Sequence, residues 1–192
     1  MEKHPQHGFT LIELMITLFI ASILLGAAIP SFVEMSVRNR LVTSTNDFIS
    51  TINLARSESI RRAATVTICG TEDGAACDAD AWSTGWIVFA DTNSDGDRDV
   101  GEPLLRVHEG LGNGYTLSPD DAFATSVSYG ADGSADDTGV FAVCHDGEVA
   151  GARAIILTRL RPRVGRDTDS PADGIPNIEG GNISGCTDPS SV

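Results

Sequence analysis

The chain has almost no lysine: Lys3 is the only one among 192 residues, and the other basic residues are arginines. Acidic residues outnumber basic ones by 27 to 13, so the formal net charge is −14. A strongly acidic protein repels the phosphates of nucleic acids. This charge excludes a general nucleic-acid-coating role and leaves room only for a local basic site.

Sequence motifs of the common enzyme classes are missing as well. The chain has no G-x-S-x-G elbow, no P-loop and no H-E-x-x-H motif. Of its four histidines, His4 and His7 lie near the N-terminus, His108 follows an expected strand, and His145 stands beside Asp146. We therefore predict that the chain is not an enzyme, and we identify no cofactor apart from the calcium ion considered below.

Charge is absent from residues 14–33. A helix rises about 1.5 Å per residue, so this apolar run is long enough to span a hydrocarbon core of about 30 Å. The acidic residue Glu13 lies immediately before it. A carboxylate close to hydrocarbon is costly, which marks Glu13 as a functional residue.

A cleaved secretory signal peptide is the alternative interpretation of this run, with small residues at 26–28 for cleavage. Three features count against it. The first residues are barely basic, because Glu2 offsets Lys3. Glu13 stands where the apolar region of a signal peptide should begin, and the run continues into an amphipathic segment.

The order of residues at the N-terminus carries a resemblance. Gly8, then Phe9-Thr10-Leu11-Ile12-Glu13 and a long apolar helix resemble the prepilin signature of type IV pilins and type II secretion pseudopilins. The resemblance implies that a prepilin peptidase removes the leader, residues 1–8, after Gly8, and that Phe9 is then N-methylated. Glu13 would pair with the amine of a neighbouring subunit, since a carboxylate among apolar helices needs a cationic partner.

The same resemblance implies a single-pass protein of the cell inner membrane, with its globular domain in the periplasm. The charges do not support this topology: Lys3 is the only cation before the span, whereas Arg38 and Arg40 lie just beyond it, and the positive-inside rule therefore favours the opposite orientation. Residues 9–33 would be the hydrophobic transmembrane and assembly helix. Pro30 lies inside this helix and should kink or loosen it.

Beyond the span, apolar residues recur at helical spacing among polar ones. One helix is therefore expected from about Phe9 to Arg62, with an amphipathic part at residues 34–62 that needs a partner surface. Residues 63–192 read as short strands and turns, with an irregular tail from residue 164. Strands are expected at 65–69, 85–90, 104–107, 115–117, 126–129, 140–144 and 152–159. The predicted fold class is α+β: a pilin-like long helix packed on a mainly antiparallel β-sheet domain.

The body of the chain narrows the resemblance. Residues 53–62, 66–69, 85–89 and 101–106 are similar to the helix end and strands of FimT/GspH-type minor pilins and pseudopilins. This similarity implies a structural subunit of a type IV pilus or a type II secretion pseudopilus, with other pilins or pseudopilins as partners. FimT-type proteins are also linked to DNA uptake. The sequence leaves the two machines open.

The chain has four cysteines, Cys69, Cys77, Cys144 and Cys186, all beyond the apolar run. In an oxidising periplasm an even number of cysteines indicates disulfides, and four cysteines allow three pairings. We predict Cys69–Cys77, which closes a short loop, and Cys144–Cys186, which ties the tail to a strand. A zinc site that includes histidines is the alternative, but no C-x-x-C spacing supports it.

Residues 91–102 match the formula of an EF-hand calcium loop, with Gly96 at the sharp turn. Oxygen ligands in this pattern suit calcium. The candidate ligands are Asp91, Asn93, Asp95, Asp97, Asp99 and Glu102. Arg98 occupies a place that is usually aliphatic, and the flanks read as strands. A solvated acidic turn is the alternative.

Four arginines fall within residues 159–166: Arg159, Arg161, Arg163 and Arg166. Arginine clusters suit bidentate contacts with phosphate, so these four are candidate DNA-binding residues. FimT-type proteins carry a Gly-Arg-x-Arg motif in this region that is associated with DNA binding. Here Thr158 replaces the glycine. The alternative is a patch that balances the acids that follow, from Asp167 to Asp173.

Overall fold

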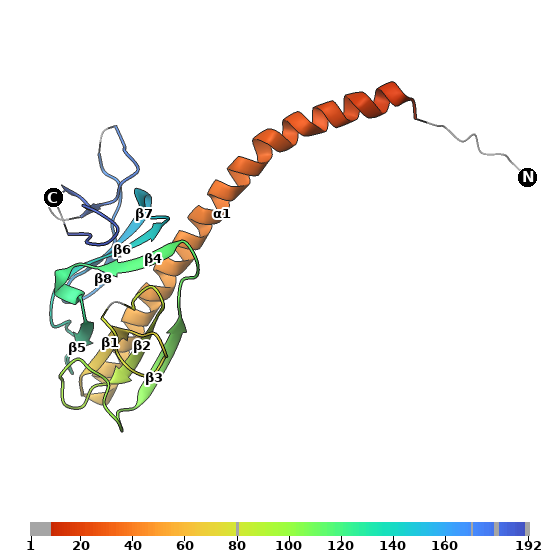
Figure 1. The fold of residues 1–192 in the computed structure, drawn as a ribbon. Helices are drawn as coiled ribbons and strands as arrows, with labels where there is room; N and C mark the ends of the chain where they lie inside the picture. Colours follow the sequence, from red (N-terminus) through yellow and green to blue (C-terminus); the bar gives the residue numbers. More distant parts are fainter. Residues whose placement is uncertain (1–8, 80, 170, 179–180, 191–192) are drawn as a thin grey trace, which may run out of the picture. The chain divides into compact units, whose positions relative to one another are not determined.

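A computed structural model describes residues 9–79, 81–169, 171–178 and 181–190 of the chain (Figure 1). The chain divides into two compact units, Met1–Asn39 and Arg40–Val192. Helix α1, Leu11–Arg62, contributes to both and is continuous through Pro30. The leader that the sequence predicts, residues 1–8, lies outside the described residues.

The second unit contains two four-stranded antiparallel sheets. In the first sheet the order is β3-β2-β1-β5, and in the second it is β4-β6-β7-β8. The first sheet consists of β1 Val66–Gly70, β2 Gly85–Ala90, β3 Leu104–Glu109 and β5 Ser126–Tyr129. The second consists of β4 Tyr115–Pro119, β6 Gly139–His145, β7 Glu148–Leu157 and β8 Pro162–Val164. A 3₁₀ turn, η1 Asp121–Phe123, and a two-stranded ribbon, β9 Asn177–Ile178 and β10 Gly181–Asn182, complete the unit.

Both sheets pack on the amphipathic half of α1 through Phe48, which is fully buried. The Phe48 ring lies 5.3 Å from the ring of Trp86 on β2 and 4.7 Å from the ring of Phe141 on β6, measured between centroids. The Trp86 indole N–H also donates to the hydroxyl of Thr51, one turn further along α1 (3.1 Å). These contacts supply the partner surface that the amphipathic pattern requires.

Successive side chains of a strand point to opposite faces of the sheet. In both sheets the face directed away from α1 is buried as well. On β6, Phe141 points toward α1, whereas Val140 and Cys144 belong to a cluster covered by the C-terminal tail. On the first sheet, Cys69 and Phe89 form the corresponding outer cluster, with Cys77 packed against it. The tail, drawn in blue in Figure 1, lies on the side of the second sheet away from α1.

Two disulfides attach the segments that cover these outer faces. Cys69–Cys77 spans 8 residues and holds the loop after β1 against the first sheet. Cys144–Cys186 spans 42 residues and holds the tail against the second sheet. No free cysteine is present among the described residues, so the alternative of a cysteine-ligated zinc site is wrong.

Three differences between the predicted and the observed elements bear on the sites, and strand β8 was not predicted either. The helix begins at Leu11 and not at Phe9, because Thr10 caps it. The last long strand, β7, runs from Glu148 to Leu157, so it starts earlier than expected and ends before Arg159. The tail that was expected to be irregular contains β9 and β10, because Asn177 pairs its backbone with Asn182 and, as an isolated bridge, with Arg166.

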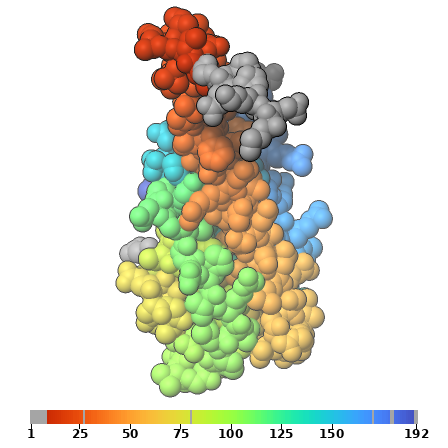
Figure 2. All heavy atoms as spheres, turned by 90° about the vertical axis from the view of Figure 1, so that its right-hand side faces the viewer, coloured from red at the N-terminus to blue at the C-terminus, as the bar shows by residue number. Residues whose placement is uncertain are grey.

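Figure 2 shows α1, in orange, beside the green segment that contains β3 on one face of the second unit. His108 of β3 stacks on the Trp86 indole, with ring centroids 3.9 Å apart, and its Nε2 lies 4.0 Å from the Asp47 carboxylate. His108 therefore packs at the seam between helix and sheet.

Candidate functional site

The start of α1 brings Thr10 and Glu13 into a reciprocal pair. The Glu13 carboxylate accepts hydrogen bonds from the Thr10 backbone N–H and the Thr10 hydroxyl, both at 2.9 Å. The Thr10 hydroxyl in turn accepts a hydrogen bond from the Glu13 N–H (3.3 Å). This is a capping box, which satisfies free N–H groups at a helix start. The sequence signal for this capping box is the Thr-x-x-Glu spacing of Thr10 and Glu13.

In the apolar part of α1, every side chain that the structure describes is exposed. The most apolar 18-residue window has a mean hydropathy of 2.4, and none of it is buried. Large side chains such as Phe9, Phe19 and Phe32 are all more than 60% exposed. By length and composition this helix is able to cross a membrane, and it needs lipid or other helices around it.

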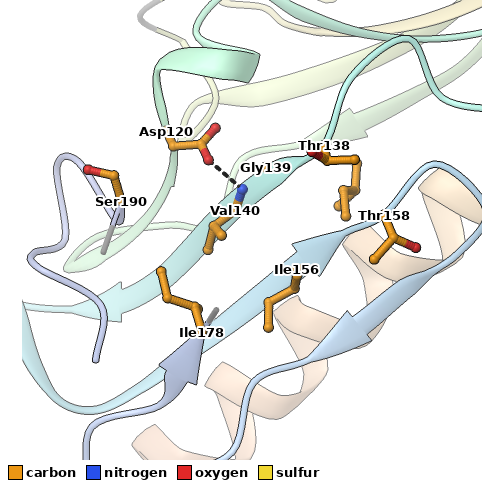
Figure 3. A pocket seen from close by; sticks show the side chains of 9 residues that line it. Asp120, Thr138, Gly139, Val140, Ile156, Thr158, Ile178 and Ser190 are labelled. Carbon is orange, nitrogen blue, oxygen red and sulfur yellow. Dashed lines mark hydrogen bonds between the residues drawn. The ribbon is translucent and has the colours of Figure 1, made fainter. Parts of the chain in front are cut away.

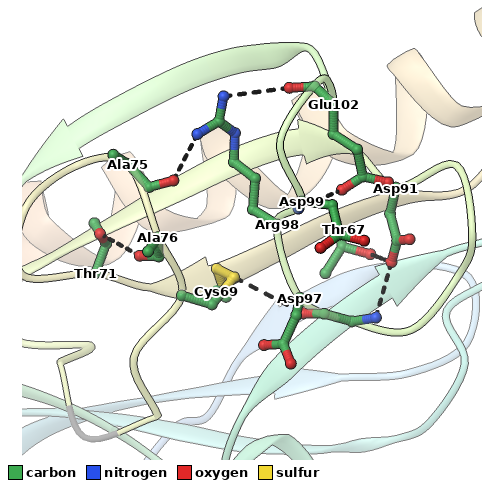
Figure 4. Close-up of a disulfide and its surroundings, with 12 residues drawn as sticks. Thr67, Cys69, Thr71, Ala75, Ala76, Asp91, Asp97, Arg98, Asp99 and Glu102 are labelled. Carbon is green, nitrogen blue, oxygen red and sulfur yellow. Dashed lines mark hydrogen bonds between the residues drawn. A yellow bond between two sulfur atoms is a disulfide. The ribbon is translucent and has the colours of Figure 1, made fainter.

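The predicted calcium loop connects β2 to β3, and its first residue, Asp91, is buried. The Asp91 Oδ1 accepts the Ser94 N–H (2.6 Å), and its Oδ2 accepts the Gly96 N–H (3.0 Å) and the Thr67 hydroxyl (2.9 Å) (Figure 4). Asp91 therefore ties the loop to itself and to β1.

The last residue of the loop, Glu102, is engaged in the same way. Its Oε1 accepts the N–H (2.6 Å) and the hydroxyl (2.9 Å) of Thr92, and its Oε2 accepts the Asp99 N–H (3.0 Å). Burial raises the pKa of the Glu102 carboxyl, but the N–H groups of Asp99 and Thr92 together outweigh burial and hold this pKa below its usual value. Arg98 crosses the loop and donates to the backbone oxygens of Ala75 (2.6 Å) and Glu102 (3.2 Å).

The middle of the loop is exposed. The Asn93 amide donates to the carboxylates of Asp95 (2.7 Å) and Asp99 (3.0 Å), and the Asp97 side chain is also exposed. Among the described residues, the one group of three acidic, His or Cys side chains with ligand atoms within 4.8 Å of one another lies elsewhere. That group is Asp167, Asp169 and Asp173. The arrangement fits an acidic turn held by its own hydrogen bonds better than a ready calcium cage, and calcium binding stays a prediction.

The four arginines lie at the β7–β8 connection, and all are exposed. Arg159 and Arg161 are in the turn, Arg163 is on β8, and Arg166 follows it. The Thr158 hydroxyl donates to the Arg161 carbonyl (2.9 Å) and accepts the Arg161 N–H (3.3 Å), so threonine closes this turn where FimT-type proteins have glycine.

A hollow of about 390 Å³ lies beside this turn, between β8 and β9. Arg163 and Arg166 line it together with Asn177 and Ile178, whereas Arg159 and Arg161 do not. The structure thus divides the predicted cluster into a pair that shares a hollow and a pair on an exposed turn.

Two known sequence patterns match the chain. The family described as "Type II transport protein GspH" matches residues 44–160, more than half of the chain, and the prokaryotic N-terminal methylation motif matches residues 3–29. The chain belongs to the GspH family. Members of this family are structural pilin-type subunits, and this chain carries the methylation signature at the end where Thr10 and Glu13 cap α1.

Individual pilin-type proteins are similar to the chain as well. The pilin-like protein PilA1 of Thermus thermophilus is 33% identical over 110 residues, which cover 56% of the GspH-family chain and 63% of the relative. Two crystal forms of the type IV minor pilin FimU of Pseudomonas aeruginosa share the fold. Their TM-scores are 0.56 and 0.53 at 19% and 17% identity, and the matches cover 79% and 75% of this chain and 98% of each FimU chain. At this identity the likeness shows the pilin-like fold alone.

Proposed function

We propose that the chain is a prepilin that is processed and then built into a type IV pilus or a type II secretion pseudopilus. Prepilin peptidase cuts after Gly8, Phe9 becomes the N-methylated first residue, and the apolar half of α1 holds the subunit in the cell inner membrane with its β-rich domain in the periplasm. The observation that carries this proposal is the exposed apolar helix. It begins within the methylation motif, and its first turn contains one acidic residue, Glu13.

Glu13 has a specific task in this proposal. Among the described residues, its carboxylate accepts hydrogen bonds from the two donors of Thr10, both of which are neutral. Packing of apolar helices around it removes water, and a carboxylate without a cationic partner is then costly. The free amine of Phe9 on a neighbouring, processed subunit supplies that partner and sets the register between the helices.

Processing is tested by expressing the full chain with and without prepilin peptidase and by intact-mass spectrometry. We expect loss of residues 1–8 and the gain of one methyl group with the peptidase only. An unchanged mass in the presence of an active peptidase would contradict the proposal. The genes that flank this one distinguish the two machines: pilus genes favour the FimT-type role and secretion genes favour the GspH-type role.

Assembly is tested with Glu13→Gln, for which Glu34→Gln is the matched control. Glu34 is an exposed carboxylate on the same helix, beyond the apolar run. We expect the Glu13 variant to be processed normally but to be depleted from sheared filaments at least tenfold, whereas the control enters them. Normal entry of both variants would remove the role of Glu13.

DNA capture is a second candidate function, favoured by the exposure of all four arginines on a chain that is otherwise acidic. Four phosphate contacts predict a slope of about −3.6 in log affinity against log salt, and hence weak binding at physiological salt. The test is a gel shift at low salt with the full chain in detergent. Arg161→Glu and Arg163→Glu should abolish binding, while Arg38→Glu, on the first unit, should not. Equal binding by all three variants, or none by the parent chain, refutes this function.

A further inference from the structure

The two sheets of the second unit have four outer edges, and other parts of the described chain pair with three of them. At β5 the Asp136 carboxylate accepts the Ser128 N–H (3.2 Å), and the Asp136 N–H donates to the Ser128 carbonyl (3.0 Å). At β4 the Ser83 hydroxyl accepts the Leu117 N–H (2.9 Å) and donates to the Leu117 carbonyl (3.2 Å). Just beyond β8, strand β9 of the tail pairs with the chain.

Asp120 closes a further gap in the same way, where β4 has ended beside β6. Its Oδ2 accepts the Val140 N–H (2.7 Å), and its backbone N–H donates to the Val140 carbonyl (2.9 Å) (Figure 3). Unpaired backbone groups at a sheet edge invite pairing with another chain, so proteins ordinarily cover or blunt such an edge. Because this chain covers its edges repeatedly, an edge that it leaves open is informative.

The outer edge of β3 is open in this sense. Strand β3 ends the strand order of the first sheet. Figure 2, which views the right-hand side of Figure 1, shows the green segment that contains β3 uncovered at the front. Beyond the ladder between β2 and β3, no described residue shares a backbone hydrogen bond with Val107 or Glu109.

The ladder shows which backbone groups of β3 point outward. Gly85, the first residue of β2, accepts a backbone hydrogen bond from the β1 side (3.0 Å), so alternate residues from Gly85 onward bond to β1 and those between them bond to β3. The β3 partners of the latter are Arg106 and His108. The backbone groups of Val107 and Glu109 therefore point away from β2. Since the Glu109 carbonyl already lies 2.5 Å from His108 Nδ1, the open groups are the N–H and C=O of Val107 and the N–H of Glu109.

The side chains of this edge suit a partner strand. Leu104 and Val107 are apolar and exposed, by 38% and 49%. A protected edge carries charges or a bulge. A bulge does interrupt the ladder before Arg106, but residues 106–109 pair regularly with β2. Val107, in the middle of this regular part, points to the opposite face of the sheet from Arg106 and His108.

We propose that an extended segment of a different, neighbouring pilin-type subunit adds to the outer edge of β3 as a fifth strand of the first sheet. Charge complementarity requires an acid opposite Arg106 and a base opposite Glu109, with an apolar residue opposite Val107. The inference rests on the proposed function in that it places the chain beside other pilins. It adds the surface through which one of those neighbours is held.

A second copy of β3 does not meet this requirement. In an antiparallel pair, residues whose backbone groups point outward stand opposite residues of the same kind on the other strand. Arg106 would then meet another Arg106, His108 or Gly110, and Glu109 would meet Val107 or another Glu109. No such register places an acid opposite the arginine or a base opposite the glutamate.

The test uses the full chain in a zwitterionic detergent. Its probe is the acetylated and amidated peptide Thr-Arg-Thr-Val-Glu-Val-Thr, whose antiparallel register supplies the three required residues. Amide hydrogen exchange followed by NMR is the readout. With saturating peptide, we expect the amides of Val107 and Glu109 to exchange at least tenfold more slowly. The amides of Arg106 and His108, which face β2, and of Ser128, on a closed edge, are internal controls that should not change.

Variants separate strand addition from other kinds of binding. Val107→Pro removes the outward N–H without removing a donor to β2, and it should abolish binding, whereas the matched control Val107→Thr keeps that N–H and should bind. Arg106→Glu should weaken binding about threefold, and a peptide with Arg in place of Glu should restore it. A peptide methylated on the backbone nitrogens that face β3 tests the same point on the parent chain, and it should not bind.

Three results would overturn the strand site: no binding at millimolar peptide, equal binding by Val107→Pro, or equal binding of the methylated peptide. Protection of the Val107 amide that grows with chain concentration in the absence of peptide would assign the edge to a second copy and overturn the choice of partner. Leader removal is measured separately on the parent chain. A failed strand site with normal processing leaves the proposed function standing, whereas failed processing refutes that function alone.

Discussion

The two disulfides offer a matched pair of perturbations, because each joins a fully buried cysteine to a more exposed one and each fastens a cover over one sheet. Cross-linking reduces the chain entropy of the unfolded state, and it does so more for a longer loop. For a span of 42 residues the loop-entropy relation predicts about 4 kcal/mol, and for a span of 8 residues about 2.5 kcal/mol. Removing Cys144–Cys186 should therefore destabilise the domain more than removing Cys69–Cys77.

The variants are Cys144→Ala/Cys186→Ala and Cys69→Ala/Cys77→Ala, each in the full chain in detergent. Urea unfolding followed by tryptophan fluorescence gives the loss of free energy, since Trp82 and Trp86 are both buried beside Phe48. Hydrogen exchange identifies the segment that loosens. Only the first variant should speed the exchange of the Ile183 amide, which donates to the tail carbonyl of Pro176. Equal losses, or protected tail amides in the first variant, would refute the reasoning.

Three further predictions concern single groups. Burial raises the pKa of Tyr129 to about 12. The unfolded chain ionises near pH 10, so stability should fall above that pH, by about 1.4 kcal/mol at pH 11. Urea unfolding at pH 9 and pH 11 tests this, and Tyr129→Phe should abolish the difference. Phe48→Ala should lower the free energy of unfolding by about 3–5 kcal/mol, because it leaves a cavity where α1 contacts both sheets. Urea unfolding measures that loss, and one below 1 kcal/mol would contradict the packing. Calcium should bind the 91–102 loop no tighter than about 10⁻⁴ M, because its end carboxylates already hold internal donors. Isothermal titration decides the point, and a micromolar dissociation constant would show that the loop rearranges.

Local patterns predicted much of this fold. The apolar run and the helical spacing after it predicted α1 to within two residues at its start, since both signals depend on neighbours along the chain. Strands β2 and β5 have the predicted bounds, and the bounds of β1, β3, β4, β6 and β7 shift by one to four residues. The short strands β8, β9 and β10 were not predicted. Thr158 accounts for one of the shifted bounds, because its side chain closes a turn and removes Arg159 from β7.

The candidate sites were harder to predict, because a site depends on which side chains meet. The EF-hand formula describes the order of oxygen ligands, but the burial of Asp91 and Glu102 against neighbouring N–H groups depends on how β1, β2 and β3 pair. The arginine cluster looks uniform along the chain. Only the position of β9 beside β8 separates Arg163 and Arg166 from the two arginines of the turn.

By itself the sequence determined how this protein begins: the methylation motif, the apolar span and Glu13 are contiguous, so their meaning does not depend on folding. It allowed three disulfide pairings, and the predicted one, Cys69–Cys77 with Cys144–Cys186, is confirmed. Only the tertiary structure decided that each disulfide covers the outer face of one sheet. The physical reason is that burial and charge environment arise from residues far apart in the chain, which the fold alone brings into contact.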